Sequence, residues 1–256
     1  MSEYSFDAAW DQERERLAGI ERLWDPGTKD ILDSLPIADG WRCLEVGAGG
    51  GSIAEWLCDR VGTSGQVLAT DLDTRFIDAI DKPNLETRSH NLLTDPPLGD
   101  TFDLVHARLL VEHLGAHVIP SLVAALRPGG VLVLEDYDFT EFVGWPEDQL
   151  CPKVRDATLG VMRARGLDPQ FGRKLVNELR SAGLDQVQAS GRTAVVRGGT
   201  PEMAFYRLSV TALRDRAVQS RAVTDAEVDH VMRLYEDPSF TFVMPTMISA
   251  WGNTTA

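Results

Sequence analysis

Glycines and a carboxylate lie close together in residues 43–57, in a pattern that suits binding of a nucleotide-type ligand. The stretch reads as a buried strand, a turn and the start of an amphipathic helix. Glu45 precedes the turn, which contains Gly47, Ala48, Gly49 and Gly51. Glycine permits a tight turn and close approach of a ligand, and the helix start offers unpaired N–H groups. We therefore expect Glu45 and these four loop residues to contact a cofactor.

The glycine spacing distinguishes between two kinds of cofactor. A dinucleotide-binding turn reads Gly-x-Gly-x-x-Gly, which would require a third glycine where this chain has Ser52. The chain instead reads Glu45-x-Gly47-x-Gly49-x-Gly51. This pattern resembles the first motif of the class I S-adenosylmethionine-dependent methyltransferases. The resemblance implies that an acidic residue near the turn holds the ammonium group or the ribose hydroxyls of S-adenosylmethionine.

Further signals follow in the order typical of that family. A second strand over 65–71 ends in a carboxylate, so we expect Asp71, in preference to Asp73, to accept hydrogen bonds from the ribose hydroxyls, with Leu72 beside it. Asn91 stands where the family usually has an Asp for the adenine amino group. Leu92 stands where a hydrophobic residue packs on the ring. The family resemblance extends over residues 41–137 and includes Phe-Asp-Leu-Val at 102–105 and the Pro-Gly-Gly turn at 128–130.

The expected fold is α/β, a Rossmann-like doubly wound sheet of seven strands with an antiparallel seventh strand. We predict two N-terminal helices, the second beginning at Asp25-Pro26, and a further helix over 74–80. The sixth strand is expected at 187–196 and the seventh at 239–248, separated by a helical insertion at about 200–237. We interpret residues 1–256 as a single methyltransferase domain. Its parts are a helical lid (1–38), a cofactor-binding core (39–140) and a C-terminal half with acceptor-pocket elements (141–256).

Histidines provide the candidate bases. His106 ends the predicted fourth strand, and His113 follows about two helical turns later beside Glu112. Either imidazole could accept a proton from the acceptor, or each could be a buried structural residue or a cofactor contact. His106 is also a candidate cofactor contact. Transfer to an amine would need no base in the methylation step.

The acceptor site is the least defined part of the sequence. Its candidates are aromatic and basic residues of the N-terminal segment, the strand ends and the insertion: Tyr4, Trp10, Arg108, Tyr137 and Tyr206. Each of them could equally be an ordinary core or surface residue. Asp136 and Asp138 lack a third ligand at suggestive spacing, so we expect no metal.

Composition restricts the class of partner. The 256 residues carry a formal net charge of −14, which argues against nucleic acid, since such partners normally need a basic surface. No apolar run of about 18 residues is present, so we expect no membrane span. The three cysteines show no metal-ligand spacing and suit a reducing cytoplasm. The oligomeric state is open, with a dimer as one option.

Three functions compete, of which the third, an NAD-type dehydrogenase, is disfavoured by Ser52 and by the late seventh strand. The first is S-adenosylmethionine-dependent methyl transfer to an O, N or C atom of a small molecule, such as a natural-product intermediate, with S-adenosylhomocysteine as the product. The second is a protein of the same fold that binds S-adenosylmethionine without methylating, either a cofactor-dependent cyclase or a regulatory protein. The cofactor site would be the same in the first two cases, because the difference lies in the acceptor pocket.

Overall fold

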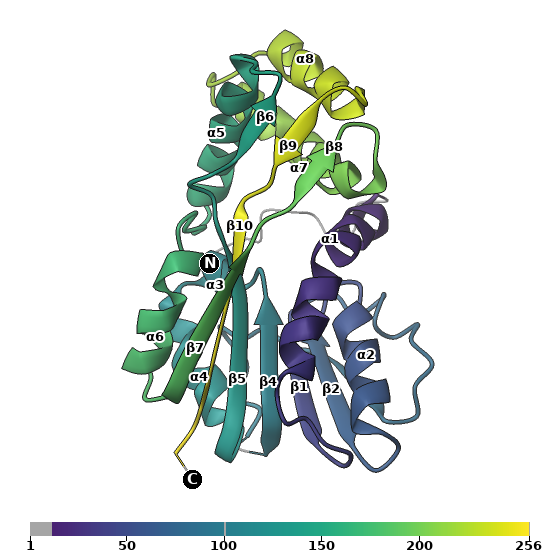
Figure 1. Cartoon of the computed structure of the whole chain (residues 1–256), viewed down its shortest axis with the longest axis vertical. Helices are drawn as coiled ribbons and strands as arrows, with labels where there is room; N and C mark the ends of the chain where they lie inside the picture. The colour runs from purple at the N-terminus through teal and green to yellow at the C-terminus, as the bar shows by residue number, and fades with distance from the viewer. Residues whose placement is uncertain (1–11, 100, 256) are drawn as a thin grey trace.

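A seven-stranded sheet forms the lower half of the molecule (Figure 1) in the computed structural model, which describes residues 12–99 and 101–255. Its spatial order is β3 (Leu85–Ser89), β2 (Gln66–Asp71), β1 (Arg42–Val46), β4 (Phe102–Arg108), β5 (Leu126–Asp138), β10 (Thr246–Asn253) and β7 (Asp185–Arg192). Strand β10 pairs antiparallel with β5 and β7, and the pairs among β3, β2, β1, β4 and β5 are parallel. The predicted α/β sheet with an antiparallel last strand is confirmed.

Helices cover both faces of this sheet because its central strands are apolar on both sides. Successive residues of β1 go to opposite faces: Cys43 packs with Leu57 on one side and Leu44 with Leu122 on the other. The first face is covered by α1 (Glu13–Asp33) and α2 (Ser52–Val61). The second face is covered by α4 (Ile119–Ala124) and α6 (Leu175–Ser181), and α3 (Val111–Leu114) and the 3-10 turns Ala116–Val118 and Gly172–Lys174 complete the lower half.

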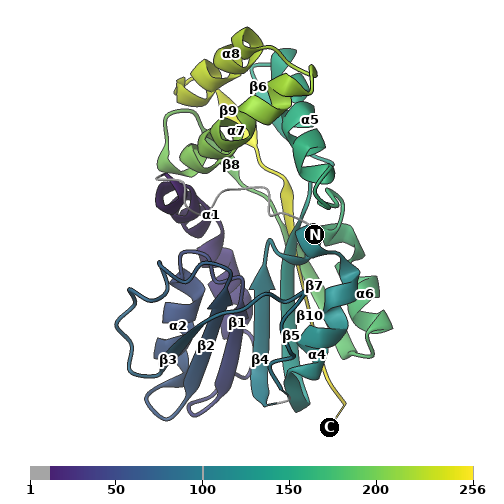
Figure 2. The ribbon, with the colours of Figure 1, turned by 180° about the vertical axis from the view of Figure 1, so that it is seen from behind.

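The upper half is a separate core above the carboxyl ends of the parallel strands (Figures 1 and 2). A three-stranded antiparallel sheet there has the order β6 (Val143–Trp145), β9 (Thr241–Val243) and β8 (Val195–Arg197). It packs with α5 (Leu150–Arg163), α7 (Pro201–Gln219) and α8 (Asp225–Glu236). The upper end of α1 lies against α7, so this helix connects the two halves beside the space between them.

The N-terminal segment contains one long helix where we predicted two. Helix α1 continues through Pro26 to Asp33, although proline removes a backbone donor and disfavours the preceding turn. Contacts on both sides of Pro26 hold the helix together: Asp25 forms an ion pair with Arg108 at 2.8 Å, and Thr28 is fully buried. Tertiary contacts therefore outweigh the local signal for a new helix start.

The predicted strands at the C-terminal end are correct in number for the main sheet but wrong at their boundaries. The sixth strand of the main sheet ends at Arg192, and 195–197 belong to the small sheet. The predicted seventh strand is divided at Pro245: β9 lies in the small sheet, and β10 runs from Thr246 to Asn253. The small sheet was not predicted, because three-residue strands leave almost no pattern.

Two further helix predictions had opposite outcomes. The insertion at 200–237 is confirmed as α7 and α8, and Thr224 and Glu227 form a capping box at the start of α8. The helix predicted over 74–80 is wrong, since this segment forms turns. Asp78 accepts hydrogen bonds from the hydroxyls of Thr74 and Thr87, which ties the segment to β3 instead of continuing a helix.

Candidate active site

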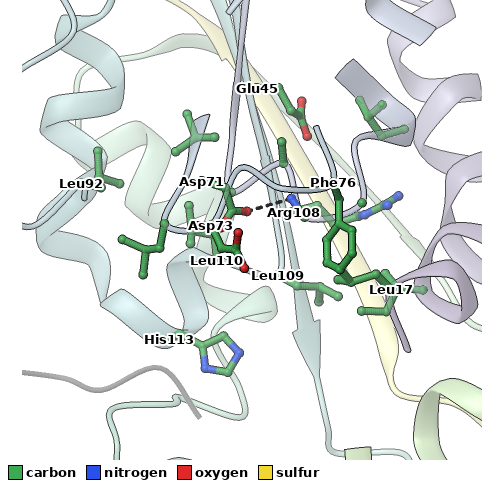
Figure 3. Close-up of a pocket in the computed structure, with 18 of the residues that line it drawn as sticks. Leu17, Glu45, Asp71, Asp73, Phe76, Leu92, Arg108, Leu109, Leu110 and His113 are labelled. Carbon is green, nitrogen blue, oxygen red and sulfur yellow. Dashed lines mark hydrogen bonds between the residues drawn. The ribbon is translucent and has the colours of Figure 1, made fainter. Parts of the chain in front are cut away.

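The glycine loop lies at the carboxyl end of β1 and is held in place from β2. Gly47 and Gly49 have φ angles of +69° and +56°, in the left-handed region that residues with a side chain rarely adopt. The Gly49 N–H donates to Asp71 Oδ2 at 2.8 Å (Figure 3). A Cβ on Gly49 would lie 3.3 Å from the Leu17 side chain on α1. The loop therefore leaves its upper surface free of side chains.

Gly51 does not contribute to that surface, which differs from the prediction. It is the residue before α2, with φ +88°, and it does not line the cavity above the loop. A Cβ there would overlap Ile80 and approach Ile77 to 3.0 Å. Gly51 thus permits close packing beneath the loop, a role that the spacing of the glycines could not distinguish from ligand contact.

A cavity of about 300 Å³ opens above the loop, at the carboxyl ends of β1, β2 and β4 (Figure 3). This is where open α/β sheets bind ligands. Ten residues predicted from the sequence line it: Glu45, Gly47, Ala48, Gly49, Asp71, Leu72, Asn91, Leu92, Arg108 and His113. Other lining residues were missed, including Arg16, Leu17, Ile20 and Glu21 of α1 and Phe76. Their helical spacing signals only an amphipathic helix, so sequence reasoning could not place them here.

Asp71 and Asp73 form the acidic side of this cavity (Figure 3). Asp71 accepts backbone N–H groups at both oxygens, from Gly49 and from Asp73 at 3.2 Å. Burial raises the pKa of the Asp71 carboxyl, and these N–H groups offset part of the rise. Asp73 is half-buried and pairs with Arg75 at 3.0 Å. Each Asp71 oxygen keeps a second lone pair, so the carboxylate can support the loop and still accept hydroxyl groups.

Apolar side chains also line the cavity, on both sides of the two aspartates (Figure 3). Leu72 is 59% exposed, and it lines the cavity together with Phe76 and Leu92. An exposed leucine in a concave site is suited to packing on a flat ligand group. Asn91 lies beside them, and its side-chain oxygen accepts the Leu93 N–H at 3.0 Å, so this amide also stabilises its own turn.

His106 lies beneath the cavity and does not line it. It is fully buried, with Nδ1 2.6 Å from Glu45 Oε2 and Nε2 3.5 Å from Glu135 Oε2. Burial disfavours the imidazolium, but the two carboxylates more than offset this and raise the pKa of His106 to about 9. Its position gives no support to the predicted roles as base or cofactor contact. A buried cation between Glu45 and Glu135 is instead a structural support for Glu45.

A ring of polar groups surrounds this histidine. Glu135 accepts hydrogen bonds from the hydroxyls of Thr28 and Ser249 and pairs with Arg192 at 2.9 Å. Burial alone would raise the pKa of the Glu135 carboxyl, but His106 and the two nearby arginines hold it well below its usual range. The ring joins α1, β1, β4, β5, β7 and β10, so it connects the floor of the cavity to the helix beside it.

The raised pKa of His106 predicts a pH-dependent stability. The folded value of about 9 exceeds the ordinary value of 6.5, so the stabilisation is complete below pH 6.5 and is lost as the pH rises through 9. For the variant His106→Gln, this dependence should be absent. Urea unfolding measures the free energy of unfolding of the wild type and of the variant. The difference between these two free energies should be smaller above pH 9 than at pH 6.5 by on the order of 3 kcal/mol. A difference that stays constant over this range would show that His106 is not a buried cation.

Arg108 lines the cavity, but its guanidinium is hydrogen-bonded to side chains of α1. Its guanidinium donates to Asp25 at 2.8 Å and to Thr28 at 2.9 Å. Both partners lie on α1, so this arginine anchors the helix at the cavity edge. The structure therefore assigns Arg108 a role in holding α1, and its predicted contact with an acceptor carboxylate would require it to leave these partners.

His113 and the two predicted tyrosines lie around a second, smaller cavity. His113 lines both cavities, whereas Tyr137 and Tyr206 line only the second. Burial, with a smaller contribution from Arg16, lowers the pKa of His113 to about 4, so its imidazole is neutral at pH 7. The remaining candidates, Tyr4 and Trp10, lie outside the described residues.

Comparison with known proteins agrees with this geometry. The sequence profile of a methyltransferase domain family matches residues 44–134. A methyltransferase of Strobilurus tenacellus is 29% identical over 186 residues, which cover 69% of this chain and 63% of that protein. The 27-O-demethylrifamycin SV methyltransferase of Amycolatopsis mediterranei is 27% identical over 93% of this chain and 86% of its own. The solved structure of the YcgJ protein of Bacillus subtilis has a TM-score of 0.61 at 13% identity, covering 91% of this chain and 99% of that one.

The fold and the loop together place a glycine loop after β1 beside a carboxylate at the end of β2, on a Rossmann-like sheet. The matched domain covers both features. Residues 44–134 thus carry a methyltransferase domain, and the chain is similar to S-adenosylmethionine-dependent methyltransferases. The Strobilurus relative is matched over less than two thirds of its length.

Two features are absent from the part of the chain that the structure describes. In the described ranges 12–99 and 101–255, no group of three or more His, Cys, Asp or Glu side chains is arranged to hold a metal ion. No helix in these same ranges is both long enough and apolar enough to cross a membrane.

Proposed function

We propose that this protein binds S-adenosylmethionine in the cavity of about 300 Å³ and transfers its methyl group to an O, N or C atom of a small molecule. One observation carries the proposal: Asp71 holds the left-handed Gly49 at the floor of this cavity. The hydrogen-bonded pair of Gly49 and Asp71 thus provides both a backbone without a side chain and a carboxylate. These are the features that a nucleoside with hydroxyl groups requires.

The lining residues fit the parts of this cofactor. Leu72, Phe76 and Leu92 provide an apolar surface for the adenine ring. Asp71, and Asp73 at its side, provide acceptors for the ribose hydroxyls. Glu45 at the other end provides a carboxylate for the ammonium group, and His106 beneath it fixes the direction of that carboxylate.

Catalysis by the chain would consist mainly of positioning and exclusion of water. When bound, S-adenosylmethionine supplies a methyl group activated by a positively charged sulfur, and it leaves as S-adenosylhomocysteine. Helix α1 closes one side of the cavity with Leu17 and Ile20, which supports the lid role expected for the N-terminal segment. Alignment of two reactants in this way can lower a barrier by roughly 7–11 kcal/mol. The neutral His113 at the edge can take up a proton when the acceptor must lose one.

Several observations support a small molecule, such as a natural-product intermediate, as the acceptor. The Amycolatopsis relative, which is matched over most of its length, is named for methylation of a rifamycin derivative. The net charge of −14 disfavours polyanionic partners. Cys43, Cys58 and Cys151 are all buried free thiols, which supports a reducing cytoplasm as the compartment.

The test is turnover in the presence of candidate acceptors. Purified protein is incubated with S-adenosylmethionine carrying a labelled methyl group, and S-adenosylhomocysteine formation is measured across phenols, amines, sugars and polyketides. Acceptor-dependent formation of S-adenosylhomocysteine, with label in the acceptor, is expected. Tight binding of S-adenosylmethionine without transfer to any acceptor would favour the non-methylating alternative, a cyclase or regulatory protein.

The ribose assignment gives a separate prediction. Asp71→Ala should weaken S-adenosylhomocysteine binding at least about tenfold, because paired hydrogen bonds to a carboxylate are lost, whereas Asp73→Ala should have a smaller effect. Calorimetric titration measures both. Because Asp71 also supports Gly49, the comparison is repeated with adenosine and 2′,3′-dideoxyadenosine. Wild type should prefer adenosine and Asp71→Ala should not; an equal preference in both proteins would refute the ribose contact.

A further inference from the structure

A second cavity of about 70 Å³ adjoins the cofactor cavity in the upper half of the molecule. This is about half the volume of an apolar cavity that encloses one benzene molecule, roughly 150 Å³, so a bound ring would extend into the adjoining cofactor cavity. Its walls come from α1, α3, β5, α5 and α7 and are mainly aromatic and apolar: Tyr137, Phe139, Met162, Phe205, Tyr206 and Leu213.

The two cavities share one wall. Arg16, Ile20, Leu109 and His113 line both of them. Leu109 has a φ of +54°, a conformation that is strained for a leucine and often found at functional sites. A ligand in the second cavity therefore meets the cofactor cavity at the edge formed by His113 and Leu109.

The cationic side chains of this second cavity are neutralised by neighbours. Arg16 is buried and makes two hydrogen bonds of 2.7 Å to Glu13. Arg155 pairs with Asp156 at 2.8 Å and donates to the Phe142 carbonyl at 2.8 Å. The arginines in the wall thus have partners within the protein and need no anionic ligand.

The surroundings of the carboxyl group in the wall disfavour its charged form. Glu112 is buried and accepts the Tyr137 N–H at 2.8 Å. Burial raises the pKa of its carboxyl well above the usual range, and the nearby Asp136 raises it further. Asp136 is itself buried, with one oxygen that has no hydrogen-bond partner among the described residues, so a charge on this pair would be poorly stabilised. Beside it, His113 is also neutral at pH 7.

We propose that the second cavity binds the methyl acceptor and selects an uncharged compound, with an apolar six-membered ring in the cavity and a hydroxyl group at the His113 edge. The proposal rests on the proposed methyl transfer for the use of that hydroxyl. An acceptor with a carboxylate or ammonium group would lose its hydration without gaining a counter-charge. The aromatic walls favour a ring through area burial and edge-to-face contacts.

Three small ring compounds of similar size test this selection: phenol, benzoate and benzylammonium. Each is titrated into protein saturated with S-adenosylhomocysteine at pH 7, and the methyl resonance of Met162 reports binding. Phenol should shift this resonance and saturate it, with benzoate and benzylammonium at least about tenfold weaker. Equal or tighter binding of either ion, or no response of Met162 to any of the three, would overturn the proposal.

A cavity-filling variant provides an independent test of the location. Ser209 lines the second cavity, and Thr211 is exposed on the same helix. Ser209→Trp should abolish the phenol response, whereas Thr211→Trp should retain it, and both should bind S-adenosylhomocysteine within threefold of wild type. Phenol binding that survives Ser209→Trp would place the ring elsewhere. Ser209→Leu, a smaller change, should give a partial loss if the tryptophan variant does not fold.

The two proposals fail in different ways. If S-adenosylhomocysteine does not bind wild type, the proposed function is wrong, and the phenol titration of the protein alone still shows whether the cavity prefers a neutral ring. If S-adenosylhomocysteine binds and the charged probes match phenol, methyl transfer stands and the acceptor class is wrong.

Discussion

Replacing Gly49 with valine is expected to abolish measurable binding of S-adenosylhomocysteine while the protein stays folded. Gly49 has a φ of +56°, its N–H is held by Asp71, and a Cβ would lie 3.3 Å from Leu17. A β-branched side chain is strained at this φ and would occupy the surface on which the ligand lies. We expect Kd to rise at least about 100-fold, equivalent to roughly 2.7 kcal/mol of lost binding free energy, measured by calorimetric titration.

A second glycine provides the control for backbone strain. Gly129 has a φ of +77°, and a Cβ there would meet no atom within 4 Å. It lies near the start of β5, at the end of the sheet away from the cavity. Gly129→Val should therefore carry similar strain, about 1–3 kcal/mol, and still bind S-adenosylhomocysteine normally. Normal binding by Gly49→Val would show that the loop is not the cofactor contact.

Removal of the His113 imidazole should reduce turnover far more than it affects cofactor binding. His113 lines both cavities, and an acceptor hydroxyl must lose its proton when it is methylated. General-base catalysis typically contributes 10²–10⁴-fold, and because a base with a pKa of about 4 is weak, His113→Ala should lower kcat by about the lower end of this range. S-adenosylhomocysteine affinity should stay within about threefold of wild type. The measurement is kcat with the acceptor found in the screen, together with a calorimetric Kd.

The pH profile separates this role from a structural one. Because the pKa of His113 is lowered to about 4, its neutral form predominates throughout pH 6–8, and kcat should be flat there and fall only as the pH approaches 4. The exposed His117 serves as control, and His117→Ala should behave as wild type. A His113→Ala enzyme with kcat close to that of wild type would remove the base from the mechanism.

The cofactor side of the site could be predicted from the sequence because its signals are local. A glycine turn after a buried strand, a carboxylate at the next strand end and a Pro-Gly-Gly turn are each read from a few consecutive residues. The parallel sheet then brings these strand ends to one edge. Gly47, Gly49, Asp71 and Leu72 accordingly line one cavity, and their contact with the cofactor stays a prediction.

Other parts of the site depend on long-range packing that a sequence does not display. His106 faces Glu45 across the β1–β4 pair, and its burial between two carboxylates follows from the whole sheet. Likewise, the sequence around Arg16 and Leu17 shows only an ordinary amphipathic helix. That these residues line the cavity depends on the position of α1 over the loop. The small sheet was missed for a different reason: β6, β8 and β9 have only three residues each.

The most direct measurement of the central claim is a calorimetric titration of the wild-type protein with S-adenosylhomocysteine, with NAD titrated under the same conditions. The proposed function predicts saturable one-site binding of S-adenosylhomocysteine and no detectable binding of NAD. Preferential binding of NAD would contradict the proposed cofactor and, with it, the methyl transfer proposed for this site.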